Sequence, residues 1–406
     1  MKLGIVLFRN HDLRLTDQPA LYNAALYCAM VLPLYIHSNP QSEMECLGAS
    51  TRARASEVFM SEAIKSLRTQ LVSKGSTLVS KCIDAYTAEA LVETIEGLIG
   101  GLNHNGDVEV FMNTRFEPKA RILDTYIIES LQLKGMKVNT YNANLLYDPQ
   151  DVSLTLTGGK WTGHWGTLMP FLNTCKKIGL PSKPLGTPEN LALPEDFKAD
   201  VESQSQEPVV DASMELWAKK IKDSWIVTEN QAEVLMLHFL HNGGLANYES
   251  QRSRVDKENS VSHLSPYLRH GLLSPRALYW GIEEAPFTKE QKKTFGRRLH
   301  WRDLAYYQLS TFPEMSSKSI RSHYDTQRWN APENVKAWQQ GQTGYPMVDA
   351  AMRELHATGW MHQSMRMVVA SFLVEFMGLD WRYGFKWFHD TLVDADVAIN
   401  SMMWQK

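Results

Sequence analysis

Three short segments in the second half of the chain carry side chains that suit an anion or a charged cofactor. Residues 259–276 combine hydroxyl groups with two Ser-Pro steps, each able to begin a helix with serine as N-cap and proline at the first position. Free backbone N–H groups at such a start suit a phosphate. Residues 301–303, Trp-Arg-Asp, place an indole beside an anion-binding guanidinium. Residues 394–406 place two carboxylates and an amide ahead of Trp404 in apolar surroundings, where acidic groups need a partner such as Arg366.

Each segment also has an ordinary structural explanation. Helix capping accounts for the Ser-Pro steps, and the basic run at 289–302 is typical of a solvated helix face. Ten of the twelve tryptophans lie in the second half, where they fit packing between helices as well as a site for a planar cofactor. Whether the segments meet in space depends on the elements that hold them.

The periodicity of the sequence divides the chain into two parts. From residue 3 to about 147, short apolar runs alternate with amphipathic helical stretches, which predicts a doubly wound parallel sheet covered on both faces. No G-x-G-x-x-G follows the first run, so the dinucleotide-binding fingerprint is missing there. Beyond a proline-containing stretch at 181–211 the pattern is helical throughout. We predict an α/β domain over 1–147, a connector over 148–211 and an all-α domain over 212–406.

Composition excludes several classes of protein. A chain of 406 residues with 44% hydrophobic residues is globular, and no apolar run reaches the ~20 residues of a membrane-spanning helix. The start of the chain predicts a first strand and no signal peptide, so we expect a cytoplasmic or nuclear protein that is not secreted. The four cysteines lack metal-ligand spacing, and no metal site is expected. The net charge is -3, but after residue 251 lysine and arginine outnumber the acidic residues by 20 to 16.

Taken in order, these segments resemble the photolyase and cryptochrome family of flavoproteins. The matching stretches are LFRNHDLRLTDQPAL at 7–21, SHLSPYLRHGLLSPR at 262–276, TGYPMVDAAMRELHATGWMH at 343–362 and LVDADVAIN at 392–400. The resemblance implies a Rossmann-like antenna domain, a long connector and a helical domain that holds FAD folded into a U. It places the isoalloxazine ring at the bottom of a buried pocket.

The resemblance also assigns roles to individual residues. Those implied to contact FAD are Tyr248, Ser262, Ser265, Arg302, Arg366, Asp394, Asp396 and Asn400. Arg366 and Asp394 match an ion pair over the flavin, and Asp396 matches an acceptor for its edge. Asn400 matches the residue facing flavin N5, where an amide accepts a hydrogen bond without supplying a proton and so favours a long-lived reduced flavin. Those implied to conduct an electron from the surface to photoexcited flavin are Trp404, Trp381 and Trp329.

The pocket that repair photolyases use for a cyclobutane dimer is only partly matched. Trp301 and Met367 fit that pocket. Arg298 stands where those enzymes have a glutamate that contacts the lesion, and Gln363 replaces an asparagine. Lys406 stands where a tryptophan packs on the dimer. These departures favour a receptor over a repair enzyme.

Other branches of the family match in different ways. The (6-4) branch has two active-site histidines in the helix expected around residue 362, and only His362 is present here. The DASH branch shares little of the pocket. The sequence DTLVDAD at 390–396, together with Asn400, is most similar to the plant-like cryptochromes. Lys119 and Ala120 replace the Asn-Glu of the folate-binding motif, so the motif does not support a folate or deazaflavin antenna. Family members usually continue for some tens of residues past Trp404, so we expect a truncated end or a missing pocket wall.

We therefore predict an FAD-binding, blue-light-responsive cryptochrome-like photoreceptor that uses flavin photoreduction through a tryptophan chain and signals to an unidentified protein. The alternative is an enzyme, a light-driven deoxyribodipyrimidine photo-lyase that repairs cyclobutane pyrimidine dimers in DNA. A structural relic without flavin is disfavoured, because the contact positions are largely kept. We expect weak DNA binding through the basic segment near Arg297 and no membrane partner.

Overall fold

Five parallel strands form one sheet in the first part of the chain. The computed structural model describes residues 1–153, 163–206 and 214–405. The strands are β1 (Leu3–Phe8), β2 (Met30–His37), β3 (Val79–Cys82), β4 (Val108–Asn113) and β5 (Lys137–Tyr141), and their order is β3-β2-β1-β4-β5. Leu3 of β1 pairs with Met30 on one side and with Val108 on the other. All of β1 is buried, as expected for the central strand of a sheet with both faces covered. The predicted α/β architecture is confirmed.

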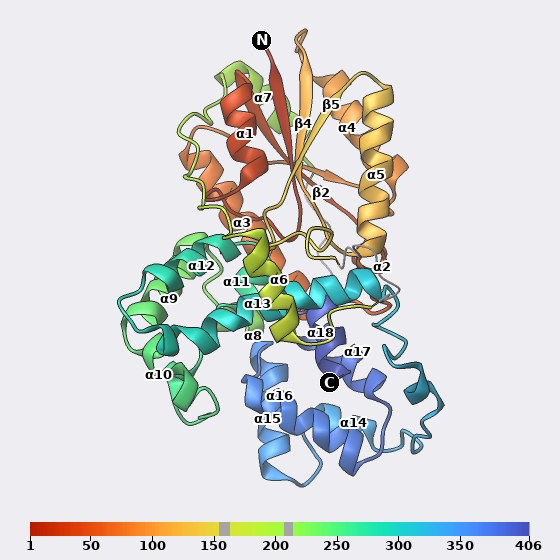
Figure 1. Ribbon diagram of the computed structural model, residues 1–406. Helices are drawn as coiled ribbons and strands as arrows, with labels where there is room; N and C mark the ends of the chain where they lie inside the picture. Colours follow the sequence, from red (N-terminus) through yellow and green to blue (C-terminus); the bar gives the residue numbers. More distant parts are fainter. Residues whose placement is uncertain (154–162, 207–213, 406) are drawn as a thin grey trace.

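Helices cover both faces of this sheet. They are α1 (Pro19–Tyr27), α2 (Pro40–Leu47), α3 (Arg54–Ser73), α4 (Ala88–Gly101) and α5 (Pro118–Leu133). Figure 1 shows α1 on one side of the strands and α4 with α5 on the other. The connections reverse direction between β1 and β4, and in such sheets ligands bind at the carboxyl ends of these strands. Here Arg9 and Arg115 both pair with the buried Asp124 at that edge.

The connector holds two helices, α6 (Leu168–Ile178) and α7 (Glu195–Ser203). The sequence predicts no regular element over 181–211, so α7 is a correction. It begins after Pro194 and forms because Val201 is buried against the α/β part. The connector contacts the sheet of the α/β part, since the Gln206 N–H donates to the Ser80 carbonyl of β3 at 2.7 Å.

The second part of the described chain is helical, as predicted. Its α-helices are α8 (Glu215–Ser224), α9 (Glu229–His241), α10 (Gly244–Gln251), α11 (Ser265–Arg269), α12 (Pro275–Glu284), α13 (Lys289–Thr311), α14 (Val335–Gln340), α15 (Pro346–Thr358), α16 (Gln363–Ser371), α17 (Trp381–Thr391) and α18 (Val397–Trp404). Two 3-10 turns, η2 (Glu258–Ser260) and η3 (Ser322–Thr326), and a π-helical turn, η4 (Phe372–Phe376), join them. Helix α13 starts at a capping box of Thr288 and Gln291 and crosses the middle of the molecule (Figure 1).

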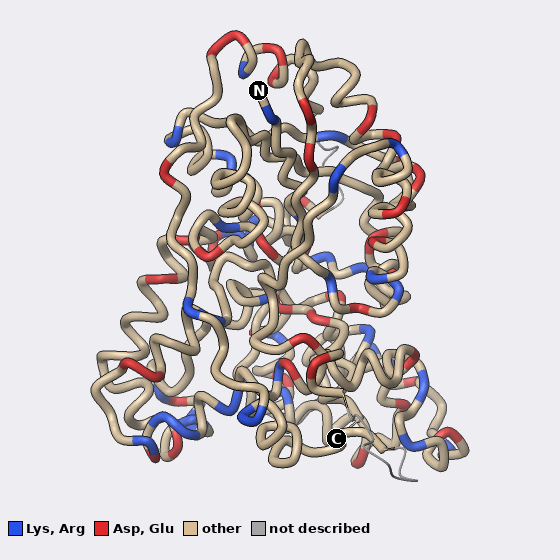
Figure 2. Tube along the Cα trace, turned by 45° about the horizontal axis from the view of Figure 1, so that its top comes forward, with Lys and Arg blue, Asp and Glu red and all other residues tan. Residues whose placement is uncertain are grey.

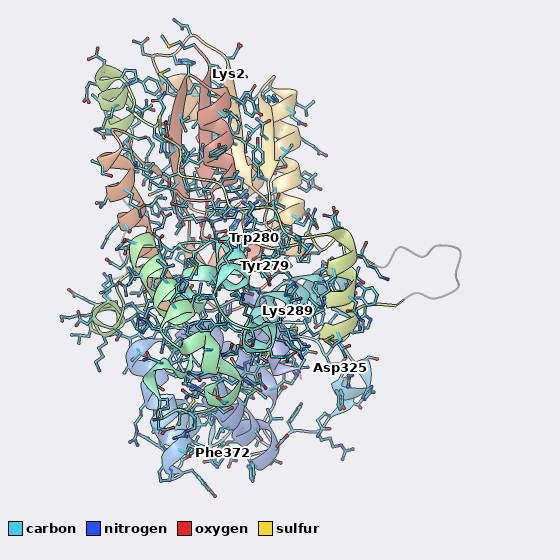
Figure 3. All side chains as sticks on the ribbon, turned by 60° about the vertical axis from the view of Figure 1, so that its left-hand side comes forward. Lys2, Tyr279, Trp280, Lys289, Asp325 and Phe372 are labelled. Carbon is cyan, nitrogen blue, oxygen red and sulfur yellow. The ribbon has the colours of Figure 1, made fainter. Side chains whose placement is uncertain are left out.

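Ion pairs join the two parts. Arg276, at the start of α12, pairs with the fully buried Asp17 at 2.6 Å, and Arg54 of α3 pairs with Asp390 of α17. In Figure 3 Tyr279 and Trp280 lie between Lys2, in the sheet part, and Phe372, at the far helical end. None of the helices in the described ranges combines the length and apolar character that crossing a bilayer requires.

Candidate functional site

A cavity of about 390 Å³ lies in the helical part, between α11 and α13 on one side and α16 and α18 on the other. The sequence-predicted residues that line it are Tyr248, Ser262, Ser265, Arg298, Trp301, Arg302, Gln363, Arg366, Asp394 and Asp396. They come from segments more than 140 residues apart in the chain. Most residues implied to contact FAD, and most of those implied for the lesion pocket, therefore share one cavity.

The ion pair of Arg366 and Asp394 is present in the wall of this cavity. Arg366 Nη2 lies 2.8 Å from Asp394 Oδ2 and Nη1 lies 3.1 Å from Oδ1, which is a bidentate contact. The Ser265 hydroxyl donates to Asp394 Oδ2 at 2.6 Å, and Arg366 Nε donates to the Met361 carbonyl at 2.8 Å. Both charges are thereby satisfied, which a largely buried pair requires.

Asp396 and Asn400 are oriented by the start of α18. Asp396 is the N-cap of this helix, so Oδ1 accepts from the Ile399 N–H at 2.9 Å, while Oδ2 accepts from the Tyr306 hydroxyl at 2.7 Å. Burial and the Asp396 charge raise the pKa of Tyr306 well above its ordinary value, so Tyr306 stays a donor. Asn400 is buried and is not among the residues that line the cavity, and its Nδ2 donates to the Phe385 carbonyl at 3.1 Å. This contact leaves Oδ1 as the acceptor end of the amide.

Arg302 is held in place by hydrogen bonds to the α/β part of the chain. It lines the cavity, and Nη1 and Nη2 donate to the carbonyl and the side chain of Asn144, which follows β5. Each terminal nitrogen carries a second N–H and Nε carries one more, so the guanidinium keeps donors for an anion in the cavity. The next residue, Asp303, accepts from the Tyr147 N–H at 3.0 Å, and burial raises the pKa of its carboxyl to about 7. Arg302 and Asp303 thus fasten α13 to the segment that follows β5 in the α/β part.

A second cavity of about 530 Å³ adjoins the first and shares Arg298 and Trp301 with it. Arg252 and Arg297 also line it, so three guanidinium groups surround the space. Figure 2 shows basic positions close together at this end of the helical part, where α10 and the start of α13 lie in Figure 1. Arg298 Nε donates to the Tyr248 hydroxyl at 3.2 Å, which holds the guanidinium at the boundary between the cavities. Such a surface suits phosphate groups.

Some expected residues lie outside the cavity. Met367 is 51% exposed and does not line it, because α16 turns this side chain to the surface. Lys406 lies outside the described residues. The structure adds Trp360 to the lining, with the His263 ring against it in a tilted contact at a centroid distance of 4.4 Å. His263 has φ +54°, a strained conformation typical of functional segments. Both residues lie within the matched segments, but only the fold shows that they meet.

The three expected electron carriers occupy successive segments. The Trp404 ring lies against Gly384 of α17, where a Cβ atom would come within 2.0 Å of the indole, and it meets Phe388 at 5.1 Å. Trp381 is the first residue of α17 and is buried. Trp329 is half-buried. Its neighbour Asn330 donates hydrogen bonds to the backbone carbonyls of residues 377 and 378, just before α17. Their electron-transfer role stays a prediction.

The chemistry of the lining fits a cofactor with a planar ring and a charged chain. Two indoles, Trp301 and Trp360, offer flat apolar surfaces, while hydroxyls and the Arg366–Asp394 pair offer convergent polar groups. In the described ranges no cluster of three or more histidine, cysteine or acidic side chains could hold a metal ion. The residues present therefore fit FAD.

Comparisons with known proteins cover both parts of the chain. Residues 4–189 match the family model of DNA photolyase, and residues 295–406 match that of the FAD binding domain of DNA photolyase. The deoxyribodipyrimidine photo-lyase of Agrobacterium fabrum is 32% identical over 404 residues, covering 99% of this chain and 79% of the relative. Cryptochrome-2 of Arabidopsis thaliana is 30% identical, covering 100% of this chain and 64% of the relative.

Comparison of the structure with solved structures agrees with the sequence matches. The crystal structure of a bacterial class III photolyase from Agrobacterium tumefaciens matches with a TM-score of 0.83 and 31% identity, covering 99% of this chain and 78% of the other. The match to the FAD-binding domain begins inside α13 and includes the elements that carry the ion pair, Asn400 and the three indoles.

Proposed function

Because the chain belongs to the photolyase and cryptochrome family of flavoproteins, we propose that it is a blue-light-responsive receptor in which light drives an electron to bound FAD. The redox change is read by a partner protein. In this proposal Trp404, Trp381 and Trp329 carry the electron from the surface. Their positions along α17 and α18 support this role, since each indole lies on or beside the same helix.

FAD supplies the absorption of blue light and a one-electron acceptor when it is bound. The chain's own residues orient and protect it. The Arg366–Asp394 pair and Ser265 present satisfied charges, so the pocket holds charge without a free ion that would recruit water. Asn400 offers an amide oxygen that accepts a hydrogen bond and holds no acidic proton to give. These features favour a reduced state that persists long enough to be read.

The observation that favours a receptor is the position of Arg298 in the lining of both cavities. At the boundary of the cavities the Arg298 guanidinium donates a hydrogen bond to the Tyr248 hydroxyl. A guanidinium donates hydrogen bonds and accepts none. A carboxylate at that point could accept from the N–H groups of a damaged base, and Arg298 cannot. The side chain adds positive charge, which attracts DNA phosphates without distinguishing a lesion.

The second candidate is a light-driven lyase for pyrimidine dimers. It is supported by the 32% identity to a deoxyribodipyrimidine photo-lyase and by Trp301, which lines both cavities. In that case a base pair opens and the dimer enters the cavity beside Trp301, while Arg252 and Arg297 hold the backbone. Weak, unselective DNA binding is common to both candidates.

One assay separates the two candidates. Reduced, FAD-loaded protein is illuminated with blue light in the presence of an oligonucleotide containing a thymine dimer, and the loss of dimers is followed. We expect slow or absent repair, while the flavin itself is photoreduced when the protein starts oxidised. Repeated turnover of dimers would establish the lyase. A variant carrying Trp404→Phe, loaded with reduced FAD, separates repair from photoreduction because repair needs no electron through that residue.

A further inference from the structure

Three methionine side chains line the cofactor cavity, and the proposed function uses none of them. They are Met361, just before α16, and Met402 and Met403 of α18. Ile399, which also lines the cavity, lies three and four positions before Met402 and Met403, so these residues share one face of α18. The wall formed by α18 therefore carries two thioether sulfur atoms, and Met361 adds a third.

The three methionines differ in how closely a small molecule can approach them. Met361 is 0% exposed and Met402 is 2% exposed, so both are packed tightly among their neighbours. Met403 is half-buried and lines the cavity, so a small molecule inside the cavity contacts Met403 first. Two methionines outside the cavity lining, Met347 and Met367, are 60% and 51% exposed and meet solutes from the solvent first.

A methionine in a cavity wall has an ordinary packing role, because its flexible side chain fills irregular space. It also brings a reactive atom that leucine or isoleucine would not bring. Peroxides oxidise the thioether sulfur of methionine to a sulfoxide. A flavin that has been reduced passes electrons to dioxygen, so peroxide is formed inside the cavity that Met403 lines.

We propose that the cavity methionines are a light-dependent modification site, at which Met403 is oxidised first. The proposal rests on the photoreduction of FAD in the proposed function, with a soluble reductant as the source of electrons and dioxygen as the oxidant. Two electrons and two protons pass from reduced FAD to dioxygen, which becomes hydrogen peroxide. The Met403 sulfur then takes one oxygen atom: a sulfur–oxygen bond forms, the oxygen–oxygen bond breaks, and water leaves. The sulfur is oxidised by two electrons and the peroxide is reduced by two.

Oxidation at residue 403 changes the wall that holds the cofactor. Met403 packs against the buried core and is followed directly by Trp404. A sulfoxide is polar and disrupts apolar packing, and it is reversed by methionine sulfoxide reductases. We expect FAD to dissociate faster after repeated illumination in air, so that prolonged light lowers the response of the receptor until the sulfoxide is reduced.

The first arm of the test follows oxidation by peptide mass spectrometry on full-length, FAD-loaded protein. The protein is illuminated with blue light in isotopically labelled dioxygen, together with a soluble reductant and with catalase, which destroys peroxide that escapes into solution. We expect about tenfold more label at residue 403 than at residues 347 and 367, because peroxide formed in the cavity has a high effective concentration there. Hydrogen peroxide added in the dark should give the reverse order, since exposed methionines then react first.

The second arm removes light and the electron path from the test. FAD is reduced with dithionite in the absence of oxygen, the excess is removed, and labelled dioxygen is admitted in the dark with catalase present, over repeated cycles. We again expect label at residue 403. An unlabelled residue 403, or more label at residues 347 and 367, would overturn the modification site. Label in this arm but none after illumination would support the site and overturn the electron path of the proposed function.

Met403→Leu measures the effect of the modification on the cofactor. Leucine has a similar volume and no sulfur. Each protein passes through the same light cycles in air and in nitrogen, and the retained FAD is read from absorbance after gel filtration. The native chain is expected to lose about twofold more FAD in air than in nitrogen, and Met403→Leu to lose equal amounts.

Met347→Leu is the matched control at an exposed site, and it should behave like the native chain. The nitrogen samples report whether each variant folds around FAD, and the mass spectrometry needs no variant. Equal extra loss of FAD in air from Met403→Leu and from the native chain would overturn the effect of residue 403 on the cofactor.

Discussion

At the scale of single residues, the site works by giving every buried charge a defined partner. Asp394 accepts from Arg366 and Ser265, and Asp396 accepts from Tyr306 and from its own helix. Breaking a buried pair by removing one partner costs about 3–5 kcal/mol, because the remaining charge is left unsatisfied. The pair is therefore sensitive to single substitutions.

Asp394→Asn tests this sensitivity. The amide keeps the shape but removes the charge that balances Arg366, so we expect FAD affinity to fall at least about tenfold. Fluorescence titration of apoprotein with FAD measures the change. Ser364→Ala, on the same helix as Arg366 and outside the cavity lining, is the control and should leave affinity unchanged. Equal affinity in Asp394→Asn would contradict a binding role for the pair.

Trp404→Phe tests the entry of electrons. Phenylalanine fills most of the space against Gly384 and Phe388 but is much harder to oxidise than an indole. We expect photoreduction to drop by about tenfold or more while bound FAD is retained. Absorbance under continuous blue light follows the first quantity, and absorbance of cofactor released by denaturation gives the second. Loss of both together would point to a packing role for Trp404.

Asp303 predicts a pH dependence of stability. Its pKa is about 7 in the folded chain because of burial, above its ordinary value of 3.8. The folded state thus holds the proton of the Asp303 carboxyl more tightly than the unfolded chain does. The contribution of this protonated carboxyl to the free energy of unfolding is complete below about pH 4 and is lost as the pH rises through 7. Asp303→Asn keeps an acceptor for Tyr147 and cannot ionise.

We expect Asp303→Asn to be more stable than the native chain at pH 8 by a few kcal/mol, at about 1.4 kcal/mol per pKa unit, and to show a much smaller difference at pH 4. Urea unfolding at the two pH values measures this. A difference that does not change with pH would show that the Asp303 carboxyl ionises normally.

At the scale of elements, the packing of α18 on α17 depends on one small residue. Gly384 has no side chain, and the Trp404 ring occupies the place where a Cβ would stand, at 2.0 Å. Two helices can approach this closely only where one of them lacks a side chain. The close approach is what brings Trp404 onto the face of α17 that carries Trp381 and Phe388.

Gly384→Ala should therefore displace Trp404. Overpacking of this kind costs about 1–3 kcal/mol in unfolding free energy, although alanine favours a helix over glycine. We expect a lower thermal midpoint together with weaker photoreduction. Gly97→Ala in α4 is the matched control, because a Cβ there meets nothing within 4 Å, and it should stabilise the chain slightly. A stabilised Gly384→Ala would mean that α18 repacks freely.

At the scale of the whole molecule, positive charge gathers beside the cofactor cavity even though the chain is acidic overall, with a net charge of -3. Arg252, Arg297 and Arg298 surround the second cavity. Long-range attraction to a polyanion depends on such local charge and weakens with salt, whereas recognition of a lesion depends on directed hydrogen bonds.

Arg298→Glu separates these two contributions. We expect it to weaken binding to undamaged DNA and reduce the salt dependence, while raising the preference for a dimer-containing strand, since a carboxylate can accept from a base. Fluorescence anisotropy with both strands at several salt concentrations measures the ratio. Lys65→Glu, an exposed site on α3 with the same change in charge, should leave the preference unaltered. No gain in preference would remove Arg298 as the reason for poor discrimination.

The sequence by itself determined the two-part architecture and most members of the site. Strand and helix periods are local properties, so the α/β and helical parts could be read without the fold. Contiguous segments with a characteristic sequence located Ser262, Ser265, Asp394 and Asp396. The resemblance also implied the Arg366–Asp394 pair, although the two residues are 28 positions apart.

Only the tertiary structure decided which side chains each of these residues meets. Arg302 donates to Asn144, 158 positions away, and Met367 turns to the surface. The second cavity needs α6, α10 and α13 together, and Met361 and Met403 line one cavity although they lie in separate segments. The physical reason is that a side chain's partners are chosen by shape and desolvation where distant elements close-pack, and no local pattern in the chain records that choice.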